Sequence, residues 1–340
     1  MRAVQSTLPP ASGRTLPLRI ISTGVACPAR HVSAEELDVQ LGRRAGATLK
    51  HSDVRARFIA GDSETQSQLG ARALVAAAHA AGVRLDTINL VLAACGVAEQ
   101  ALPSTACAIA AHAGLARGTP AFDINASCLS FMAALHQAAA LLATDSYRRI
   151  AIVSADLPSR GVDWAQLHAS SIFGDGAAAV IVERGDPDIG VCAYRLETYP
   201  EGRTHCEIRA GGTLRNPRVG VEPADFLFQM DGRAAFRLAS EVLPPMLHRT
   251  LAAAGLSLAE IDTVVPHQAS RLAIDHLAKR LQVPRERMVD IYEMHGNQVA
   301  ASLPTALAHA HAKGALAPGR HVMLIGTAAG LSAGVLVLRT

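Results

Sequence analysis

The chain has 340 residues, of which half are hydrophobic and 18% are charged, so it can form a large core and is not a disordered protein. Its net charge of +3 is too small to indicate nucleic-acid binding, and no basic run is interleaved with aromatic residues. At this length we expect two domains, or one fold built twice.

The cysteines and the N-terminus indicate the cellular setting. Six cysteines are dispersed without a Cys-x-x-Cys pair, a pattern that predicts neither a disulfide framework nor a zinc site, and free thiols favour a cytoplasmic location. Residues 1–17 lack the apolar segment of a signal peptide, and we expect a flexible tail there. The longest apolar helical stretch, 129–143, is too short to span a membrane.

Strand patterns alternate along the chain with Ala-rich helical patterns, which indicates an α/β fold. Residues 18–27 predict a first strand. Residues 63–83 predict a helix that begins with a capping box formed by Ser63 and Gln66. Further buried strands are predicted at 88–95, 149–156, 177–184 and 322–330.

Two segments half a chain apart, 76–96 and 249–269, share one plan. In each, a helix ends at Ala-Ala-Gly, a linker carries an acidic residue, Asp-Thr follows, and a buried strand comes next. Two similar halves, 18–184 and 185–340, would bring strand ends from both to one site. Chance similarity between Ala-rich segments is the alternative.

Cys128 is the candidate nucleophile. A short strand pattern and small residues lead into it, and a long apolar helix follows. A cysteine at a helix N-terminus lies at the positive end of the helix dipole, which favours the thiolate, and the free backbone N–H groups there can bind an oxyanion. A structural cysteine in the core is the alternative.

The second half offers two partners for a thiolate. His267 lies between a predicted strand and a helix, and Asn297 lies in a Gly-Asn turn that opens an Ala-rich helix. Taken alone, His267 is explained more simply as a structural histidine and Asn297 as a helix N-cap. His295 is an alternative to His267 as the catalytic histidine. The set of Cys, His and Asn at element ends predicts nucleophilic catalysis. No histidines and carboxylates have the spacing of metal ligands.

Four segments resemble the β-ketoacyl-acyl-carrier-protein synthase III family of the thiolase superfamily: 101–128, 172–183, 265–281 and 295–307. The resemblance implies a thiolase-like five-layer αβαβα fold of two duplicated halves. It implies Cys128 as nucleophile, His267 and Asn297 as the decarboxylation pair, and an oxyanion hole from the backbone N–H groups of Cys128 and the Ala329–Gly330 turn. No metal or redox cofactor is implied.

The resemblance also implies partners. These are acyl and malonyl thioesters, an acyl carrier protein that contacts Arg271, Lys279 and Arg280, and a second copy of the chain, since Leu102 takes the place of the family's gate residue that crosses a homodimer. The resemblance implies a divergent member rather than the housekeeping initiator, because the residues that hold the starter CoA in the family are replaced. The replacements are Ala47 for a tryptophan, His51 and Ser52 for an arginine and a threonine, and Leu167 for an arginine.

The resulting prediction is an enzyme in which an acyl thioester acylates Cys128 and a malonyl thioester then condenses with loss of CO₂, in a fatty acid, polyketide or related specialised pathway. Acyl transfer to a hydroxyl or amine without condensation is one alternative. A Cys-His-Asn thioester hydrolase and a non-catalytic synthase subunit are two others. The acyl chain length, the choice between CoA and carrier protein, and the extender stay open.

Overall fold

The computed structural model describes residues 15–340 and contains two five-stranded sheets. In spatial order, the first sheet consists of β2 (Arg19–Ala26), β8 (Gly176–Glu183), β7 (Arg149–Asp156), β5 (Leu90–Ala93) and β6 (Ala121–Asp123). The second consists of β1 (Leu16–Pro17), β9 (Gly190–Thr198), β14 (Ser332–Arg339), β13 (His321–Ala328) and β12 (Thr263–Pro266).

The two sheets repeat one topology. In the first, β2, β8 and β7 are antiparallel neighbours and β7 runs parallel to β5. In the second, β9, β14 and β13 are antiparallel neighbours and β13 runs parallel to β12. Helix α3 (Gln66–Ala80) precedes β5, and α7 (Gly232–Ala254) precedes β12. The duplication predicted from the repeated segments is therefore confirmed.

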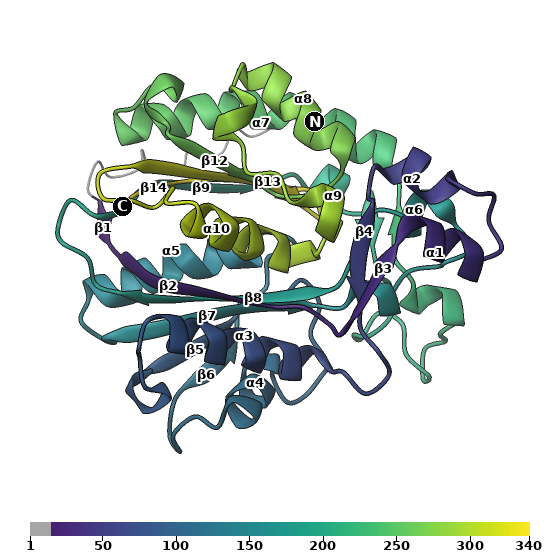
Figure 1. Ribbon diagram of the computed structural model, residues 1–340, viewed down its shortest axis with the longest axis horizontal. Coiled ribbons are helices and arrows are strands. Elements are labelled where there is room, and N and C mark those ends of the chain that lie inside the picture. Colours follow the sequence, from purple (N-terminus) through teal and green to yellow (C-terminus); the bar gives the residue numbers. More distant parts are fainter. Residues whose placement is uncertain (1–14) are drawn as a thin grey trace.

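The elements stack in five layers (Figure 1). Helices α5 (Ser130–Ala143) and α10 (Ser302–Ala312) lie between the two sheets. Helices α3 and α4 (Thr105–Ala113) cover the outer face of the first sheet, and α7 and α8 (Arg271–Leu281) cover the outer face of the second. This is the αβαβα arrangement that the family resemblance implied.

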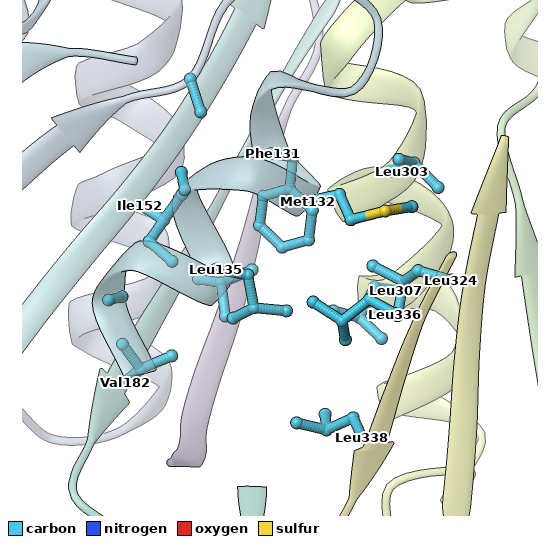
Figure 2. Packing of buried hydrophobic residues seen from close by; sticks show 14 of the residues in the cluster. Phe131, Met132, Leu135, Ile152, Val182, Leu303, Leu307, Leu324, Leu336 and Leu338 are labelled. Carbon is cyan, nitrogen blue, oxygen red and sulfur yellow. The ribbon is translucent and has the colours of Figure 1, made fainter. Parts of the chain in front are cut away.

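Because side chains alternate along each strand, each sheet packs against helices on both of its faces. Successive side chains of a strand point to opposite faces, so Ile150 and Ile152 of β7 face the central helices while Ala151 and Val153 face α3 and α4. The central layer is rich in large side chains, and Figure 2 shows Phe131, Met132 and Leu135 of α5 among leucines from α10 and the second sheet. Each fully buried leucine contributes about 2 kcal/mol of hydrophobic free energy.

The smaller elements gather beside one edge of the sheets (Figure 1). They are β3 (Arg30–Ser33), α1 (Ala34–Gln40), α2 (Ala47–Ser52), β4 (Ala56–Ile59), α6 (Leu167–Ser170) and α9 (Tyr292–His295). A short ribbon of β10 (Cys206–Glu207) and β11 (Gln229–Met230) follows the first strand of the second half. Within residues 15–340, no helix is long and apolar enough to cross a membrane.

Two local predictions need correction. Most of the tail expected at 1–17 lies outside the described residues, but Leu16 and Pro17 form β1 and pair with β9, so that end of it is ordered. Helix α3 begins later than predicted, because its capping box is formed by Thr65 and Gln68. The side chain of Gln66, which was expected to complete the box, donates instead to the carbonyl of Val97 (2.8 Å).

Candidate active site

Cys128 lies in a tight turn between β6 and α5. Ser127 has a φ of 51°, a left-handed conformation that non-glycine residues seldom adopt. Its N–H is held by the side chain of Asn125 (3.0 Å), and Ser130 ties the turn to the end of β5 by donating to the carbonyl of Cys95 (2.9 Å). The turn presents Cys128, which keeps partial exposure, while the following Leu129 is buried.

Burial raises the pKa of the Cys128 thiol to about 12, against the lowering effect of the backbone N–H groups of Ala329 and of Cys128 itself. The prediction that the helix dipole would favour the thiolate is therefore wrong for the resting protein. Cys128 precedes α5 by two residues, and burial removes the hydration that its charged form needs. Although the Cys128 side chain is partly exposed, protein atoms surround its sulfur, and this burial sets the direction of the pKa shift.

His267 directly follows β12, as predicted. Its backbone N–H donates to the carbonyl of Ile325 on β13 (2.8 Å), which fixes the residue beside the sheet. The side chain is buried, and this burial lowers its pKa to about 4, so the imidazole is neutral near pH 7. Nδ1 has no hydrogen-bond partner among residues 15–340. A neutral imidazole of this kind carries one N–H to donate.

The hydrogen bonds of Asn297 decide which way its carboxamide faces. Oδ1 accepts the N–H of Val299 (2.8 Å), and Nδ2 donates one proton to the carbonyl of Ala269 (3.3 Å). The second Nδ2 proton stays available for a substrate oxygen. Asn297 is therefore not the N-cap of α10, which is Ala301; its Oδ1 closes a local turn with Val299, and this contact orients the carboxamide.

A chain of short contacts links the three residues. A Cβ built on Gly326 would lie 2.6 Å from the Cβ of His267 and 3.2 Å from the side chain of Leu129, the neighbour of Cys128. Asn297 bonds to Ala269, two residues after His267. The loop after β13 brings the N–H of Ala329 to the Cys128 thiol. Strand and helix ends from both halves thus meet at one place.

Sequence reasoning missed Asp156, a buried carboxylate at the end of β7. One oxygen accepts the N–H of Gly96 (2.8 Å), and the other accepts the N–H of Ala301 (3.2 Å) in the turn that follows Asn297. Burial raises the pKa of Asp156 to about 8, opposed by these hydrogen bonds. The signal was available, because a carboxylate ended a strand predicted to be buried. Asp156 joins the two halves beside the site.

The remaining predicted residues have surroundings of their own. Leu102 is 86% exposed on the loop that follows β5. Arg271 forms an ion pair with Asp290, in which Nη1 lies 2.5 Å from Oδ2. Lys279 and Arg280 are exposed in the last turn of α8. His295 packs its ring against Phe58 and His309 and is no rival to His267.

The residues expected at the starter-donor position lie on α2 and α6, which contact each other. Ala47 begins α2, and Leu167 begins α6. Ser52 is buried and donates to the carbonyl of Thr48 (2.8 Å), so its hydroxyl is engaged within the protein. His51 is exposed. Within residues 15–340, no cluster of three or more His, Cys, Asp or Glu side chains is placed to hold a metal ion.

Comparison with known proteins agrees with this arrangement. Residues 122–200 match the family 3-oxoacyl-[acyl-carrier-protein] synthase III, and residues 251–340 match the C-terminal family of the same synthase. The β-ketoacyl-[acyl-carrier-protein] synthase III of Bordetella petrii is 34% identical over 325 residues, which cover 94% of this chain and 97% of the relative. That of Syntrophomonas wolfei is 30% identical over 323 residues, covering 95% and 97%.

Comparison with solved structures supports the same family and fold. The crystal structure of 3-oxoacyl-(acyl carrier protein) synthase III from Pseudomonas aeruginosa superposes with a TM-score of 0.84 at 30% identity, covering 95% of this chain and 98% of that one. OleA from Xanthomonas campestris, at 18% identity and a TM-score of 0.83 over 96% and 100% of the two chains, shares the fold. The chain therefore belongs to the β-ketoacyl-acyl-carrier-protein synthase III family.

Proposed function

We propose that the enzyme first transfers an acyl group from a thioester to Cys128. The Cys128 sulfur attacks the carbonyl carbon, the bond from that carbon to the donor sulfur breaks, and the donor leaves as a thiol that takes up the proton. The backbone N–H groups of Cys128 and of the Ala329–Gly330 turn bind the oxyanion. The effect of the Ala329 and Cys128 amides on the thiol pKa supports this assignment.

Condensation with a malonyl thioester follows. The bond to the carboxylate breaks, CO₂ leaves, and the electron pair passes into an enolate whose oxygen accepts hydrogen bonds from His267 and Asn297. The enolate carbon attacks the acyl carbonyl, the bond to the Cys128 sulfur breaks, and the β-ketoacyl thioester leaves. The orientation of Asn297 supports the proposal, because the Val299 N–H holds its oxygen and one Nδ2 proton remains after the bond to Ala269.

The reaction needs no metal or redox cofactor, because loss of CO₂ drives the carbon–carbon bond formation. For delivery of the malonyl group we propose an acyl carrier protein that docks on α8 near Lys279 and Arg280. Both side chains are exposed, and the acidic face of a carrier protein would complement them. Arg271 contributes less than its neighbours because Asp290 already neutralises it.

A homodimer in the cytoplasm is the proposed working form. Strand β6 ends the first sheet, and its Phe122 is 43% exposed, which suits pairing with a second copy. Leu102 lies on a neighbouring exposed loop, from which it would reach the acyl site of the partner. The six cysteines are all free thiols, as expected in a reducing compartment.

The starter is proposed to be longer than acetyl. Ala47 and Leu167 offer neither an aromatic platform for adenine nor a cation for a phosphate, and the Ser52 hydroxyl is engaged. An aromatic stack is worth about 1–3 kcal/mol, so acetyl-CoA should prime Cys128 at least about tenfold more slowly than the true donor. Leu102 is smaller than an aromatic gate residue and leaves more room for a chain.

The test combines intact-mass spectrometry with CO₂ measurement. Purified protein is incubated with acetyl-CoA, with medium-chain acyl-CoA or with acyl carrier donors, and malonyl-acyl-carrier-protein is then added. We expect a Cys128 adduct from the longer donors, followed by CO₂ release and a β-ketoacyl product. Transfer to a hydroxyl or amine without CO₂ would favour the simple acyltransferase, and release of free acid would favour the hydrolase. Fast, saturable priming by acetyl-CoA would overturn the starter proposal.

A further inference from the structure

The buried carboxyl group of Asp156 binds the turns on two sides of the candidate site. Its side chain is 3% exposed, and its Oδ1 accepts the N–H groups of Gly96 (2.8 Å) and Val97 (3.3 Å) in the turn that follows β5. Its Oδ2 accepts the N–H of Ala301 (3.2 Å), which lies in the second half of the chain. One side chain therefore supplies acceptors to two turns from different halves.

The first of these turns holds the residues that precede the nucleophile. The carbonyl of Gly96 accepts a hydrogen bond from Nδ2 of Asn125 (3.2 Å), and Oδ1 of Asn125 accepts the N–H of Ser127 (3.0 Å). Ser127 is the left-handed residue directly before Cys128. Three hydrogen bonds thus lead from Asp156 to the turn that presents the Cys128 thiol.

The second turn holds Asn297. The N–H of Ala301 donates to Asp156 and also to the carbonyl of Gln298 (3.0 Å). Val299 lies inside this turn and donates its N–H to Oδ1 of Asn297 (2.8 Å). The bond from Ala301 to Asp156 therefore holds the turn whose other end orients the Asn297 carboxamide.

Val299 shows that this second turn has to be held in place. Its φ is 53°, a left-handed conformation in which a β-branched residue is strained. Such a conformation persists only where the surrounding structure imposes it. A Cβ built on Gly96 would lie 2.3 Å from Cγ1 of Val299 and 3.2 Å from Oδ1 of Asp156. The two turns therefore touch at Gly96, and Asp156 binds both of them beside this contact.

We propose that Asp156 is a positioning residue for decarboxylation, which places the Asn297 donor relative to Cys128 by binding both turns. The proposal rests on the function proposed above for Asn297. Both oxygens of a carboxyl group can accept hydrogen bonds, whereas a carboxamide has one acceptor oxygen and an NH₂ group that only donates. In Asp156→Asn the side chain can therefore serve the Gly96 turn or Ala301, but not both. We expect it to keep the two bonds of the Gly96 turn and to release the turn of Asn297.

The experiment measures the two steps of the reaction separately. Self-acylation is followed by intact mass, and CO₂ release by single turnover with enzyme that is already acylated. Asp175→Asn is the matched control, because Asp175 is also buried and its carboxylate accepts the N–H groups of Ala60 (2.8 Å) and Ser159 (2.9 Å), both in the first half. A displacement of about 1 Å can cost about 10²-fold in rate, so Asp156→Asn should slow CO₂ release by about that factor while sparing acylation. Asp175→Asn should show no such selective loss.

A double variant separates the positioning of Asn297 from a general loss of structure. Because Asp156 acts through Asn297 in this proposal, adding Asp156→Asn to Asn297→Ala should slow CO₂ release by less than about a further twofold. A further drop as large as in the wild-type background would overturn the proposal. The amide hydrogens of residues 297–302, followed by deuterium exchange and mass spectrometry, should exchange faster in Asp156→Asn but not in Asp175→Asn.

Two other results for Asp156→Asn would also overturn the proposal. Equal loss of acylation and CO₂ release would mean that the carboxyl group maintains the site as a whole, and unchanged CO₂ release would mean that it positions nothing. If this variant does not fold, Gly96→Ala tests the same contact, because its Cβ displaces Val299 without removing a hydrogen-bonding group. Selective loss of CO₂ release is again expected, and wild-type release would again overturn the proposal.

Failure of the proposed function gives a different result. In that case the wild type releases no CO₂ from a malonyl thioester, or Asn297→Ala releases it at the wild-type rate. The deuterium exchange of residues 297–302 does not depend on the reaction, so it still decides whether Asp156 holds this turn. Unchanged exchange in Asp156→Asn would then overturn the proposal.

Discussion

Replacing Gly326 by alanine tests whether the site depends on the placement of His267. The new Cβ would lie 2.6 Å from the His267 Cβ, whereas ordinary contact begins at 3.4 Å, so His267 must shift by roughly 0.8 Å. Rotation of the side chain cannot relieve the clash, because the Cβ is fixed to the backbone. A misplacement of about 1 Å can cost about 10²-fold in rate. We expect malonyl decarboxylation to fall by about that factor.

The matched control is Gly334→Ala. Gly334 pairs with Gly326 across β13 and β14, but its added Cβ would meet the flexible ends of Met132 (2.9 Å) and Leu129 (3.0 Å) rather than His267. Acylation is followed by intact mass, CO₂ release by single-turnover assay with preacylated enzyme, and stability by thermal unfolding. Gly334→Ala should lose stability without selective loss of decarboxylation. Wild-type CO₂ release by Gly326→Ala would refute the reasoning.

Three further predictions concern individual residues. Because the pKa of Cys128 is raised to about 12, its alkylation by iodoacetamide should accelerate about tenfold per pH unit from about pH 7 to about pH 10, as followed by peptide mass spectrometry, and a plateau below this range would contradict that pKa. His267→Ala and Asn297→Ala should each slow CO₂ release by about 10²–10³-fold while sparing self-acylation, and unchanged release would remove their role in binding the enolate oxygen. Burial raises the pKa of Asp156 to about 8, so the stability that its protonated form contributes is present at low pH and is lost as the pH rises through about 8. The melting temperature of Asp156→Asn should therefore fall less than that of the wild type between about pH 5 and about pH 8, and parallel curves would contradict the assignment.

The duplication and the Cys-His-Asn set could be predicted because both leave local traces in the sequence. The Ala-Ala-Gly helix ends and the Asp-Thr linkers recur before β5 and β12, since each half builds the same helix–strand unit. Cys128, His267 and Asn297 each sit at the boundary of an element, where a change from an apolar run to small or polar residues is visible. The layer order came from the family resemblance.

The errors arose where distant residues decide a local outcome. The segment at the start of α3 holds two overlapping capping boxes, Ser63 with Gln66 and Thr65 with Gln68, and local rules rank them equally. The loop after β5 selects the second, because Val97 engages the Gln66 side chain. The pKa of Cys128 likewise depends on how many atoms surround the thiol, whereas the helix dipole was the only contribution that the sequence made visible.

Contacts that charged side chains make with residues far away in the sequence could not be predicted either. Arg271 was expected to be free for a carrier protein, but Asp290, which follows in the next loop, holds it in place. Asp156 showed only a carboxylate at the end of a buried strand, and its backbone partners come from both halves of the chain. The space between α7 and α8, which Pro244 lines, depends on how closely the two helices approach, and the proline pair in α7 does not give that distance.

The duplicated fold explains why the proposed catalytic groups come from four different element ends. Cys128 precedes α5 and Asn297 precedes α10, the two helices that occupy equivalent central places in the halves. Strand β12 ends immediately before His267, and β13 ends in the turn that supplies the Ala329 N–H. In the proposed mechanism, acylation of Cys128 in the first half would draw on an amide of the second, and decarboxylation by the second half would be useful only beside an acyl group on the first. Neither half alone would then hold a complete site, and the hydrogen bonds of Asp156 to Gly96 and Ala301 hold the two parts together.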